Sequence, residues 1–378
     1  MAGLLSDASV IERVFDHIDN KTTDHSDETW QEPVENYRSA ERFEAELALL
    51  RRLPIPFCPS VALPDTGSYV ARTAAGTPLL VVRGEDGTVR AFRNACRHRG
   101  MQVAKGSGCV NAFVCGYHGW TYRLNGQLTH IPHESGFPNF DKSEHPLVPV
   151  DVFEKHGLVF VTQDEPIDNG ALDGLDDIPD LLTPDQTIFT SGDTISDVNW
   201  KLNMEANLEG YHIKPTHRET FYPYGFDNLN VVENFGYNSR VTYPFRRIEK
   251  LRDVLPESRN IAGMVTYVYQ LFPNVSIAVL SNHTTVTISE PLSPTCTRFF
   301  NYRLTNKGEK KGSNDERAKR DASFVADTGG KEDAAVVRAI QESIMSGANK
   351  HFTYGKFEKA IVHFHRTLTG MLQRMEQA

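Results

Sequence analysis

Several features that would assign a function directly are missing from this 378-residue sequence. No apolar run approaches the roughly 20 residues that a membrane-spanning helix needs, so we expect no membrane span. A glycine-rich nucleotide-binding fingerprint of the GxGxxG kind is also absent, which leaves any NAD(P)H or flavin to a partner protein. Basic residues number 40 against 49 acidic ones, and the net charge of −9 disfavours nucleic acid or an anionic membrane surface as a partner.

Cysteine is scarce, with five residues in the whole chain. Three of them, Cys58, Cys109 and Cys296, are scattered and have no obvious counterpart. An odd and dispersed set is typical of reduced thiols, so we expect a cytoplasmic protein without a disulfide framework. The first twenty residues agree with this expectation, because acidic residues occur too early for a signal peptide.

The chain is long enough for two domains, and the pattern of its residues changes from helix-like to strand-like at Pro54. A helical pattern over 37–53 ends there. Short strand-like runs follow, separated by turns such as Asp86-Gly87 and Asn125-Gly126, which favour β-hairpins. These patterns predict an all-β domain over residues 54–165.

The remainder of the chain mixes helices and strands. Helical patterns occupy 199–214, 331–345 and 357–374, and four strand-like runs lie between 264 and 304. We therefore predict an α+β domain, formed by residues 1–53 and 166–378, in which a central antiparallel sheet is flanked by helices.

Two short segments each contain one cysteine and one histidine. Cys96 and His98 lie in the first, Cys115 and His118 in the second, and a glycine follows soon after each histidine. Two thiolates and two imidazoles are the ligands of a [2Fe–2S] cluster in which one iron binds cysteine and the other histidine. A structural zinc site is the alternative, although zinc motifs usually pair Cys with Cys and His with His.

A second group of candidate ligands surrounds Pro215. His212 lies in the last turn of the helix that this proline is expected to end, and the bend must reorient His217 toward it. Two such histidines can bind one metal ion, although neighbouring histidines on a turn are also commonly solvated. Asp333 heads an apolar helical stripe, where a buried carboxylate would need a cation. It can equally be an ordinary acidic residue at a helix N-terminus.

Taken in order, these motifs resemble the catalytic (alpha) subunit of Rieske non-haem iron oxygenases, a family of aromatic-ring-hydroxylating dioxygenases, mono-oxygenases and demethylases. The resemblance covers about residues 37–375. Besides the Cys/His loops it includes Asn199-Trp-Lys, Glu209-Gly-Tyr-His-x4-His, Phe272-Pro-Asn, and Glu332-Asp333 with Gln341 eight residues later. It implies an all-β Rieske domain joined to a helix-grip catalytic domain.

The resemblance also implies two sets of metal ligands. For a [2Fe–2S] cluster they are Cys96, His98, Cys115 and His118, and for one Fe²⁺ ion they are His212, His217 and Asp333. Glu209 stands where the family usually has an aspartate that connects the cluster of one subunit to the iron of its neighbour. Glutamate is one methylene longer than aspartate. The carboxylate chemistry is therefore kept, while the geometry of the contact is left open.

The implied function is that of a terminal oxygenase. Such a component uses O2 and electrons from a separate NAD(P)H-dependent reductase, and we expect it to be a homotrimer. We expect hydroxylation of an aromatic or hydrophobic small molecule, as in aromatic hydrocarbon catabolism. Oxidative N- or O-demethylation of a quaternary ammonium or methoxy compound is the alternative. An electron carrier and a ligand-binding module are alternatives from other classes. An electron carrier would bind no mononuclear iron, which iron analysis tests, whereas a ligand-binding module would bind its ligand tightly without substrate-dependent consumption of NADH or O2.

Three residues are further candidates for the substrate pocket: Asn207, Phe272 and His283. Each also has a simpler interpretation. Asn207 can be an exposed helix residue, Phe272 can belong to the core of the sheet, and His283 can face solvent in a hairpin turn.

Overall fold

The computed structural model describes residues 4–167, 172, 175–177, 180–306 and 315–377. The chain divides into two compact units. The smaller comprises residues 50–167 and 180–184, and the larger comprises 1–49, 168–179 and 185–378. Both are built on antiparallel sheets, and the larger one adds helices, so the prediction of an α+β fold is confirmed.

The smaller unit consists of a seven-stranded sheet in the order β2-β11-β10-β5-β4-β3-β6 and a three-stranded sheet β7-β8-β9. Its strands are β2 (Ile55–Pro59), β3 (Ser68–Ala74), β4 (Thr77–Arg83), β5 (Val89–Arg93), β6 (Gly106–Cys109), β7 (Phe113–Val114), β8 (Thr121–Tyr122), β9 (Leu128–His130), β10 (Pro149–Lys155) and β11 (Leu158–Thr162). The expected hairpin turns occur, with Gly87 and Gly126 at positive φ. Leu80, Phe92 and Trp120 belong to the buried core of this unit.

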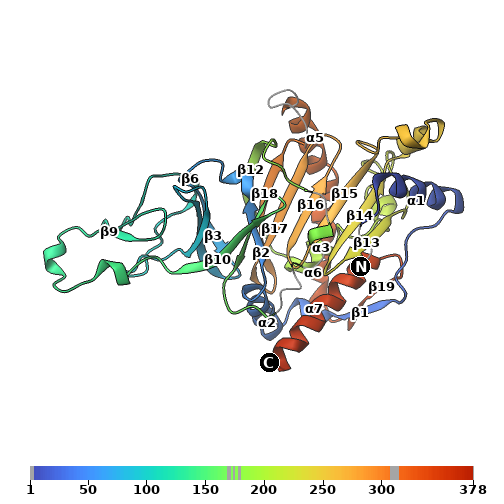
Figure 1. The fold of residues 1–378 in the computed structure, drawn as a ribbon. Helices are drawn as coiled ribbons and strands as arrows, with labels where there is room; N and C mark the ends of the chain where they lie inside the picture. Colours follow the sequence, from blue (N-terminus) through green and yellow to red (C-terminus); the bar gives the residue numbers. More distant parts are fainter. Residues whose placement is uncertain (1–3, 168–171, 173–174, 178–179, 307–314, 378) are drawn as a thin grey trace. The chain divides into compact units, whose positions relative to one another are not determined.

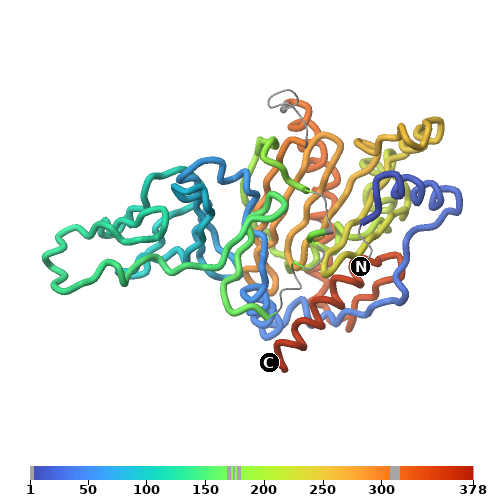
Figure 2. Tube along the Cα trace, in the orientation of Figure 1, coloured from blue at the N-terminus to red at the C-terminus, as the bar shows by residue number. Residues whose placement is uncertain are grey.

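The larger unit contains a seven-stranded antiparallel sheet in the order β12-β18-β17-β16-β15-β14-β13 (Figure 1). Its strands are β12 (Ile188–Ser196), β13 (Val231–Phe235), β14 (Asn238–Pro244), β15 (Val265–Leu271), β16 (Val275–Val279), β17 (Thr284–Ser293) and β18 (Cys296–Leu304). A two-stranded sheet pairs β1 (Trp30–Pro33) with β19 (His351–Tyr354), which brings an early and a late segment side by side, as the trace shows (Figure 2).

Helices accompany the larger sheet. They are α1 (Asp7–Asn20), α2 (Ala40–Arg51), which runs across the boundary of the unit, α3 (Trp200–Glu205), α4 (Ile213–Thr216), α5 (Asp315–Asp327), α6 (Gly329–Ile344) and α7 (Lys359–Gln377). The helix α3 contacts β17 and α6, while α7 contacts β13 and β14. Among the described residues, no helix combines the length and the apolar character needed to cross a membrane.

The single helix predicted over 199–214 is wrong. The structure has the short helix α3, a break, and then the single turn α4. The side chain of Glu209 accepts hydrogen bonds from the backbone N–H groups of Tyr211 and His212, which competes with helical bonding. Gly210 lies so close to the Asn230 side chain that a Cβ at this position would be 2.2 Å from Oδ1. The break therefore follows from one acidic side chain and one tightly packed glycine.

A buried polar cluster anchors α3. Glu205, at the end of this helix, accepts hydrogen bonds from Tyr37 (2.6 Å) and Tyr354 (2.9 Å), and His365 Nε2 lies 2.9 Å from it. Burial acts to raise the pKa of Glu205, but the hydrogen bonds, that with His365 foremost, hold the pKa below its usual value. A carboxylate buried in this way needs these partners, so the cluster fixes the position of α3.

Candidate active site

Three predicted ligands converge in the larger unit. His212 caps the start of α4, His217 caps its end, and Asp333 lies in the first turns of α6. Oδ1 of Asp333 is 2.8 Å from Nε2 of His217 and 3.6 Å from Nε2 of His212. One ligand atom from each of the three lies within 4.8 Å of the others. Two imidazoles and one carboxylate in this arrangement are typical of non-haem Fe(II) sites.

A glutamate contacts the Nδ1 atom of each histidine, on the side of the ring opposite to Asp333. Nδ1 of His212 bonds to Glu209, and Nδ1 of His217 lies 2.7 Å from Oε2 of Glu332. Thr220 donates to the same oxygen of Glu332 at 2.6 Å. A carboxylate at Nδ1 keeps the proton there, which leaves the Nε2 lone pair facing Asp333. The sequence analysis assigned Glu332 no contact with a histidine, although its place beside Asp333 in the Glu332-Asp333 motif was a usable signal.

The surroundings of His217 fit a bound metal ion. Burial acts to lower the pKa of this imidazole, yet the carboxylates of Asp333 and Glu332 outweigh burial and raise the pKa. The same charges favour any cation at Nε2, whether a proton or a metal ion. Nε2 is buried and makes no well-directed hydrogen bond within the described chain, despite the short distance to Asp333. An orphaned ring nitrogen beside a carboxylate is the environment of a metal ligand.

The two Cys/His loops of the smaller unit have the same backbone geometry. In the first, the N–H of Cys96 donates to the carbonyl of Met101, and the N–H of Gly100 donates to the carbonyl of Cys96, both at 2.8 Å. In the second, Cys115 and Gly119 repeat this pattern at 2.8 and 2.9 Å. Gly100 and Gly119 have φ of +79° and +76°, which only glycine adopts readily. The glycines seen in the sequence are therefore required by the turns.

The side chains of these loops fit a [2Fe–2S] cluster. Cys96 and Cys115 are buried and form no disulfide. The rings of His98 and His118 lie 4.6 Å apart, centroid to centroid. Nδ1 of His98 is buried without a hydrogen-bond partner among the described residues, as expected for a nitrogen that ligates iron. Trp120 stacks on His98 at 4.9 Å and shields it.

Tyr122 is a contact that sequence reasoning missed. Its hydroxyl lies 3.3 Å from Sγ of Cys96 and accepts a hydrogen bond of 2.8 Å from the backbone N–H of Arg97. Hydrogen bonds to cluster sulfurs are one of the means by which a protein adjusts the reduction potential. The sequence carried no signal for this contact, because the strand β8 brings Tyr122 to the first loop only in the fold.

A cavity of about 1060 Å³ adjoins the three converging ligands. His212, His217 and Asp333 are part of its wall, as is Asn207, which was expected to line the substrate pocket. Alternate residues of the large sheet form its floor, and they are mostly polar: Thr194, Thr266, Val268, Ser276, Ala278, Thr285, Thr287, Asn301 and Arg303. Aromatic side chains also line it, namely Phe221, Tyr224, Phe226, Tyr243, Phe245 and Phe324.

Two pocket residues expected from the sequence do not line this cavity within the described chain. Phe272 is buried in the core against Tyr237 and Phe364, because α7 covers that end of the sheet. His283 is 1% exposed and bonds through Nδ1 to Asp321 Oδ2 at 2.9 Å. The alternative of a solvent-facing His283 is therefore wrong as well. Its contact with the cavity is indirect, through Asp321.

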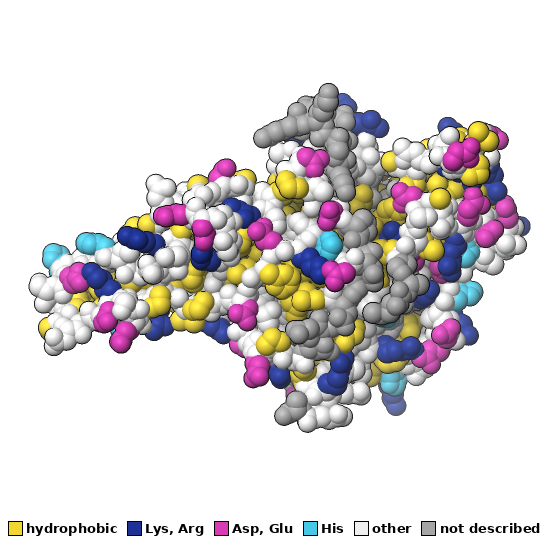
Figure 3. All heavy atoms as spheres, in the orientation of Figure 1, with side chains coloured by type: hydrophobic (Ala, Val, Ile, Leu, Met, Phe, Trp, Pro, Cys, Tyr) yellow, Lys and Arg dark blue, Asp and Glu magenta, His cyan; other side chains and the backbone are white. Residues whose placement is uncertain are grey.

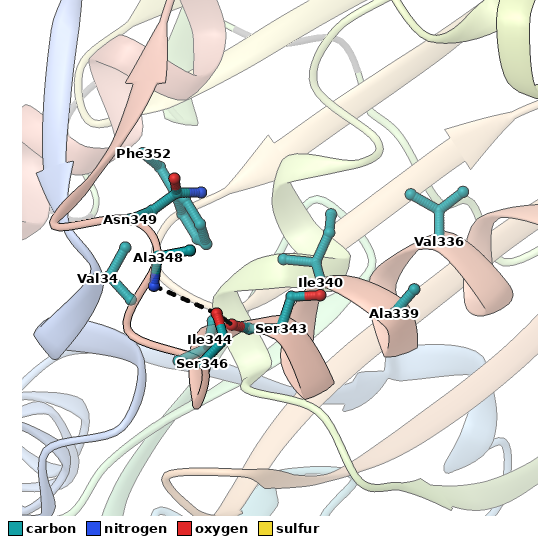
Figure 4. A pocket seen from close by; sticks show the side chains of 10 residues that line it. All are labelled: Val34, Val336, Ala339, Ile340, Ser343, Ile344, Ser346, Ala348, Asn349 and Phe352. Carbon is teal, nitrogen blue, oxygen red and sulfur yellow. Dashed lines mark hydrogen bonds between the residues drawn. The ribbon is translucent and has the colours of Figure 1, made fainter.

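A smaller hollow of about 350 Å³ lies along α6, and its lining includes none of the three converging ligands (Figure 4). Its lining consists of apolar and small uncharged residues: Val34, Val336, Ala339, Ile340, Ser343, Ile344, Ser346, Ala348, Asn349 and Phe352. None of these side chains titrates, so this hollow offers no acid, base or metal ligand.

Two protein-family models match the segments that contain the two groups of candidate ligands. The model described as "Ring hydroxylating alpha subunit (catalytic domain)" matches residues 186–374, and the model "Rieske [2Fe-2S] domain" matches residues 54–141. The first contains His212, His217 and Asp333, and the second contains both Cys/His loops.

Known proteins with similar sequences are oxygenase subunits. The glycine betaine monooxygenase oxygenase subunit of Chromohalobacter salexigens is 37% identical over 164 residues, which are 42% of this chain and 36% of that protein. The carnitine monooxygenase oxygenase subunit of Acinetobacter pittii is 31% identical, over 50% of this chain and 53% of that protein. The corresponding Escherichia coli K12 subunit is 28% identical, over 70% and 77%. The chain thus spans about a third to a half of the first two relatives.

Solved structures show the same fold. The quaternary ammonium Rieske monooxygenase CntA in complex with an inhibitor superposes with a TM-score of 0.78 at 22% identity, covering 98% of this chain and 99% of that one. Naphthalene 1,2-dioxygenase from Rhodococcus sp. bound to indole gives a TM-score of 0.75 at 19% identity, with coverage of 98% and 99%.

Proposed function

The chain belongs to the family of ring-hydroxylating alpha subunits, and from that membership we propose that it is the terminal oxygenase of a Rieske non-haem iron system. It would take electrons from a separate NAD(P)H-dependent reductase and oxidise a small molecule with O2. The observation that carries this proposal is the convergence of His212, His217 and Asp333 in the wall of a large cavity.

The residues of the two sites have different roles. Cys96, His98, Cys115 and His118 would hold the cluster, and His212, His217 and Asp333 would hold the iron. When bound, the cluster supplies single electrons and the ferrous ion supplies coordination positions for O2. Glu209 and Glu332 keep the Nδ1 protons of the two iron-binding histidines in place.

The contacts of Glu209 suit a further role. Its two carboxylate oxygens already accept hydrogen bonds from His212 Nδ1 and from the backbone N–H groups of Tyr211 and His212, just before α4. We propose that this carboxylate also receives the cluster-ligand histidine of a neighbouring subunit in a homotrimer. One structure of a quaternary ammonium Rieske monooxygenase is described as giving insight into inter-subunit electron transfer, which supports this arrangement.

We propose a quaternary ammonium compound as the substrate class, oxidised by mono-oxygenation or N-demethylation. Two groups of relatives act on carnitine or glycine betaine. Aromatic walls such as Phe221 and Tyr243 offer cation–π contacts to a trimethylammonium group. An aromatic acid is the second candidate, because a 2-aminobenzenesulfonate 2,3-dioxygenase alpha subunit is 35% identical over 163 residues. The polar floor of the cavity suits a neutral aromatic hydrocarbon less well.

Iron analysis and oxygen uptake test the proposal together. Anaerobically prepared protein should contain about three iron atoms per chain, two from a cluster and one from the mononuclear site. Asp333→Ala should lower this number to about two, keep the visible absorption of the cluster, and reduce substrate-dependent O2 uptake with a surrogate reductase at least ~100-fold.

Asp327→Ala is the matched control, since Asp327 is an exposed residue paired with Lys331 just before the same helix. It should leave iron content and uptake unchanged. Wild-type turnover by the Asp333→Ala protein with its full iron complement would refute the proposed iron site. An iron content of two in the unaltered protein would instead favour an electron carrier.

A further inference from the structure

The acidic side chains that line the large cavity all have partners. Asp333 faces the iron-binding histidines, with Oδ1 2.8 Å from His217 Nε2. Asp321 is bonded to Nδ1 of the buried His283 at 2.9 Å. Both carboxylates therefore already have a partner within the protein.

Two of the three arginines in the lining are also engaged. Arg247 donates to the carbonyl of Gly263 at 2.6 Å and to the hydroxyl of Ser281 at 2.7 Å. Arg246 is exposed, and its guanidinium lies 5.2 Å from the centroids of two aromatic rings that flank it. Its position at an exposed edge suits a solvated cation.

Arg303 differs from both. It lies near the end of β18, opposite Thr285 of β17, and is half-buried in the floor of the cavity. Throughout the described part of the chain, no hydrogen bond, ion pair or aromatic contact engages its guanidinium. A guanidinium carries five N–H donors, so a partly desolvated one without acceptors is unfavourable unless a ligand or water supplies them.

The neighbours of Arg303 on the floor complete a polar surface. Thr285 and Thr287 follow each other along β17, and Asn301 precedes Arg303 on the same face of β18. Thr287 donates to Asn301 at 3.0 Å, which orients that amide. Hydroxyl and amide donors beside a guanidinium suit an oxyanion, which can accept two parallel N–H bonds from arginine.

We propose that Arg303 binds an oxyanion of the substrate, a carboxylate or a sulfonate, and so selects acids and zwitterions over neutral or purely cationic molecules. This inference rests on the proposed function for its view of the cavity as the substrate site. It adds a recognition residue that lies outside both sets of metal ligands.

Matched pairs of ligands test it by binding alone. Calorimetric titration of anaerobic, iron-loaded protein would compare trimethylglycine with its amide, and benzoate with benzamide, because each amide keeps the shape and removes the negative charge. The wild-type protein should bind at least one acid about 10- to 100-fold more tightly than its amide. Arg303→Gln should reduce this preference to about threefold or less, and Arg303→Lys should keep part of it, because lysine retains the charge without the planar fork.

Arg298→Gln is the control. Arg298 is on the same strand but on its other face, paired with Asp193, and it should keep the wild-type preference for acids. The inference fails if Arg303→Gln retains the preference, if it weakens acid and amide equally, or if the wild-type protein shows no preference.

Measurements of oxygen uptake distinguish a failure of this inference from a failure of the proposed function. Arg303-dependent binding of acids without any substrate-dependent O2 uptake would uphold the anion site and reject the oxygenase. Oxygen uptake that is equal with acid and amide and unaffected by Arg303→Gln would uphold the oxygenase and reject the anion site.

Discussion

At the scale of single residues, the site depends on the side chains behind the ligands as much as on the ligands. Glu209 and Glu332 each hold Nδ1 of one histidine, so that both Nε2 atoms face Asp333. Only one of the two glutamates lies close in sequence to its histidine. The other reaches His217 from α6, and its contribution is separately testable.

Glu332→Ala should weaken iron binding at the mononuclear site by about 10- to 100-fold, because His217 loses the acceptor that orients its ring. Glu332→Gln should weaken it less, since an amide oxygen still accepts from Nδ1–H. Loss of iron to a chelator of known affinity measures the effect. Lys331→Ala, at the exposed neighbouring position, serves as control, and wild-type iron retention by Glu332→Ala would contradict the positioning role.

A second residue-scale prediction concerns pH. Burial, together with the nearby charges of Glu209 and Glu205, raises the pKa of Glu358 to about 7. A carboxyl with a raised folded-state pKa stabilises the fold below its unfolded pKa, and this stability is lost as the pH rises through 7. Since Glu358 is partly solvated, the loss relative to Glu358→Gln should be about 1–2 kcal/mol.

Unfolding midpoints at pH 5 and pH 8 measure this difference. The Glu358→Gln protein should lose less stability than the wild-type protein between these pH values. Glu376→Gln, at the exposed end of α7, should follow the wild-type curve. Parallel curves for the Glu358→Gln and wild-type proteins would show that Glu358 does not titrate in this range.

At the scale of elements, the proposed iron site joins two pieces of backbone that must approach closely. The broken α3–α4 segment supplies the histidines, and the first turns of α6 supply Glu332 and Asp333. Gly329 makes the approach possible, because a Cβ there would lie 2.0 Å from the ring of Phe221. That ring in turn contacts His217, at 4.8 Å between centroids.

Gly329→Ala should therefore displace the start of α6 from His217 and lower the iron content from about three toward two per chain. The cluster should remain, since both of its loops belong to the other unit. Gly370→Ala is a suitable control, because a Cβ at that helical position meets nothing within 4 Å. Full iron content in Gly329→Ala would show that the helix tolerates the shift.

At the scale of the whole molecule, charged side chains of both signs share the visible face of the surface. On the face shown in Figure 3, basic and acidic side chains are interspersed rather than gathered into a field of one sign. This agrees with the net charge of −9.

If electrons cross between subunits of a trimer, two inactive proteins should complement each other. Co-expressed Cys96→Ser and Asp333→Ala subunits, carrying different tags and purified as mixed oligomers, should recover a substantial part of the O2 uptake that each lacks alone. The oligomer should have about three times the chain mass of 42.5 kDa. Inactive mixed oligomers would indicate that each chain uses its own cluster.

The local chemistry of short segments explains which features of the fold and of the site could be predicted from the sequence. The ligand types, their spacing and the glycines of the cluster loops are properties of short segments, so the motifs and the α+β class were readable from the amino-acid order alone. The proposed iron ligands were foreseeable as residue types, but the bend expected at Pro215 was wrong, because this proline lies inside the single turn α4 and His212 and His217 cap the two ends of that turn.

Long-range pairing decided the rest. Glu332 behind His217, Tyr122 beside Cys96 and Arg303 in the cavity floor all depend on contacts between segments far apart in the chain. The assignment of Phe272 and His283 to the pocket failed for the same reason, since α7 and Asp321 determine where those side chains lie. The alternative of a core position for Phe272 is confirmed. The type of a side chain is given by its position in the sequence. Its contacts come from tertiary packing, which is a property of the folded chain.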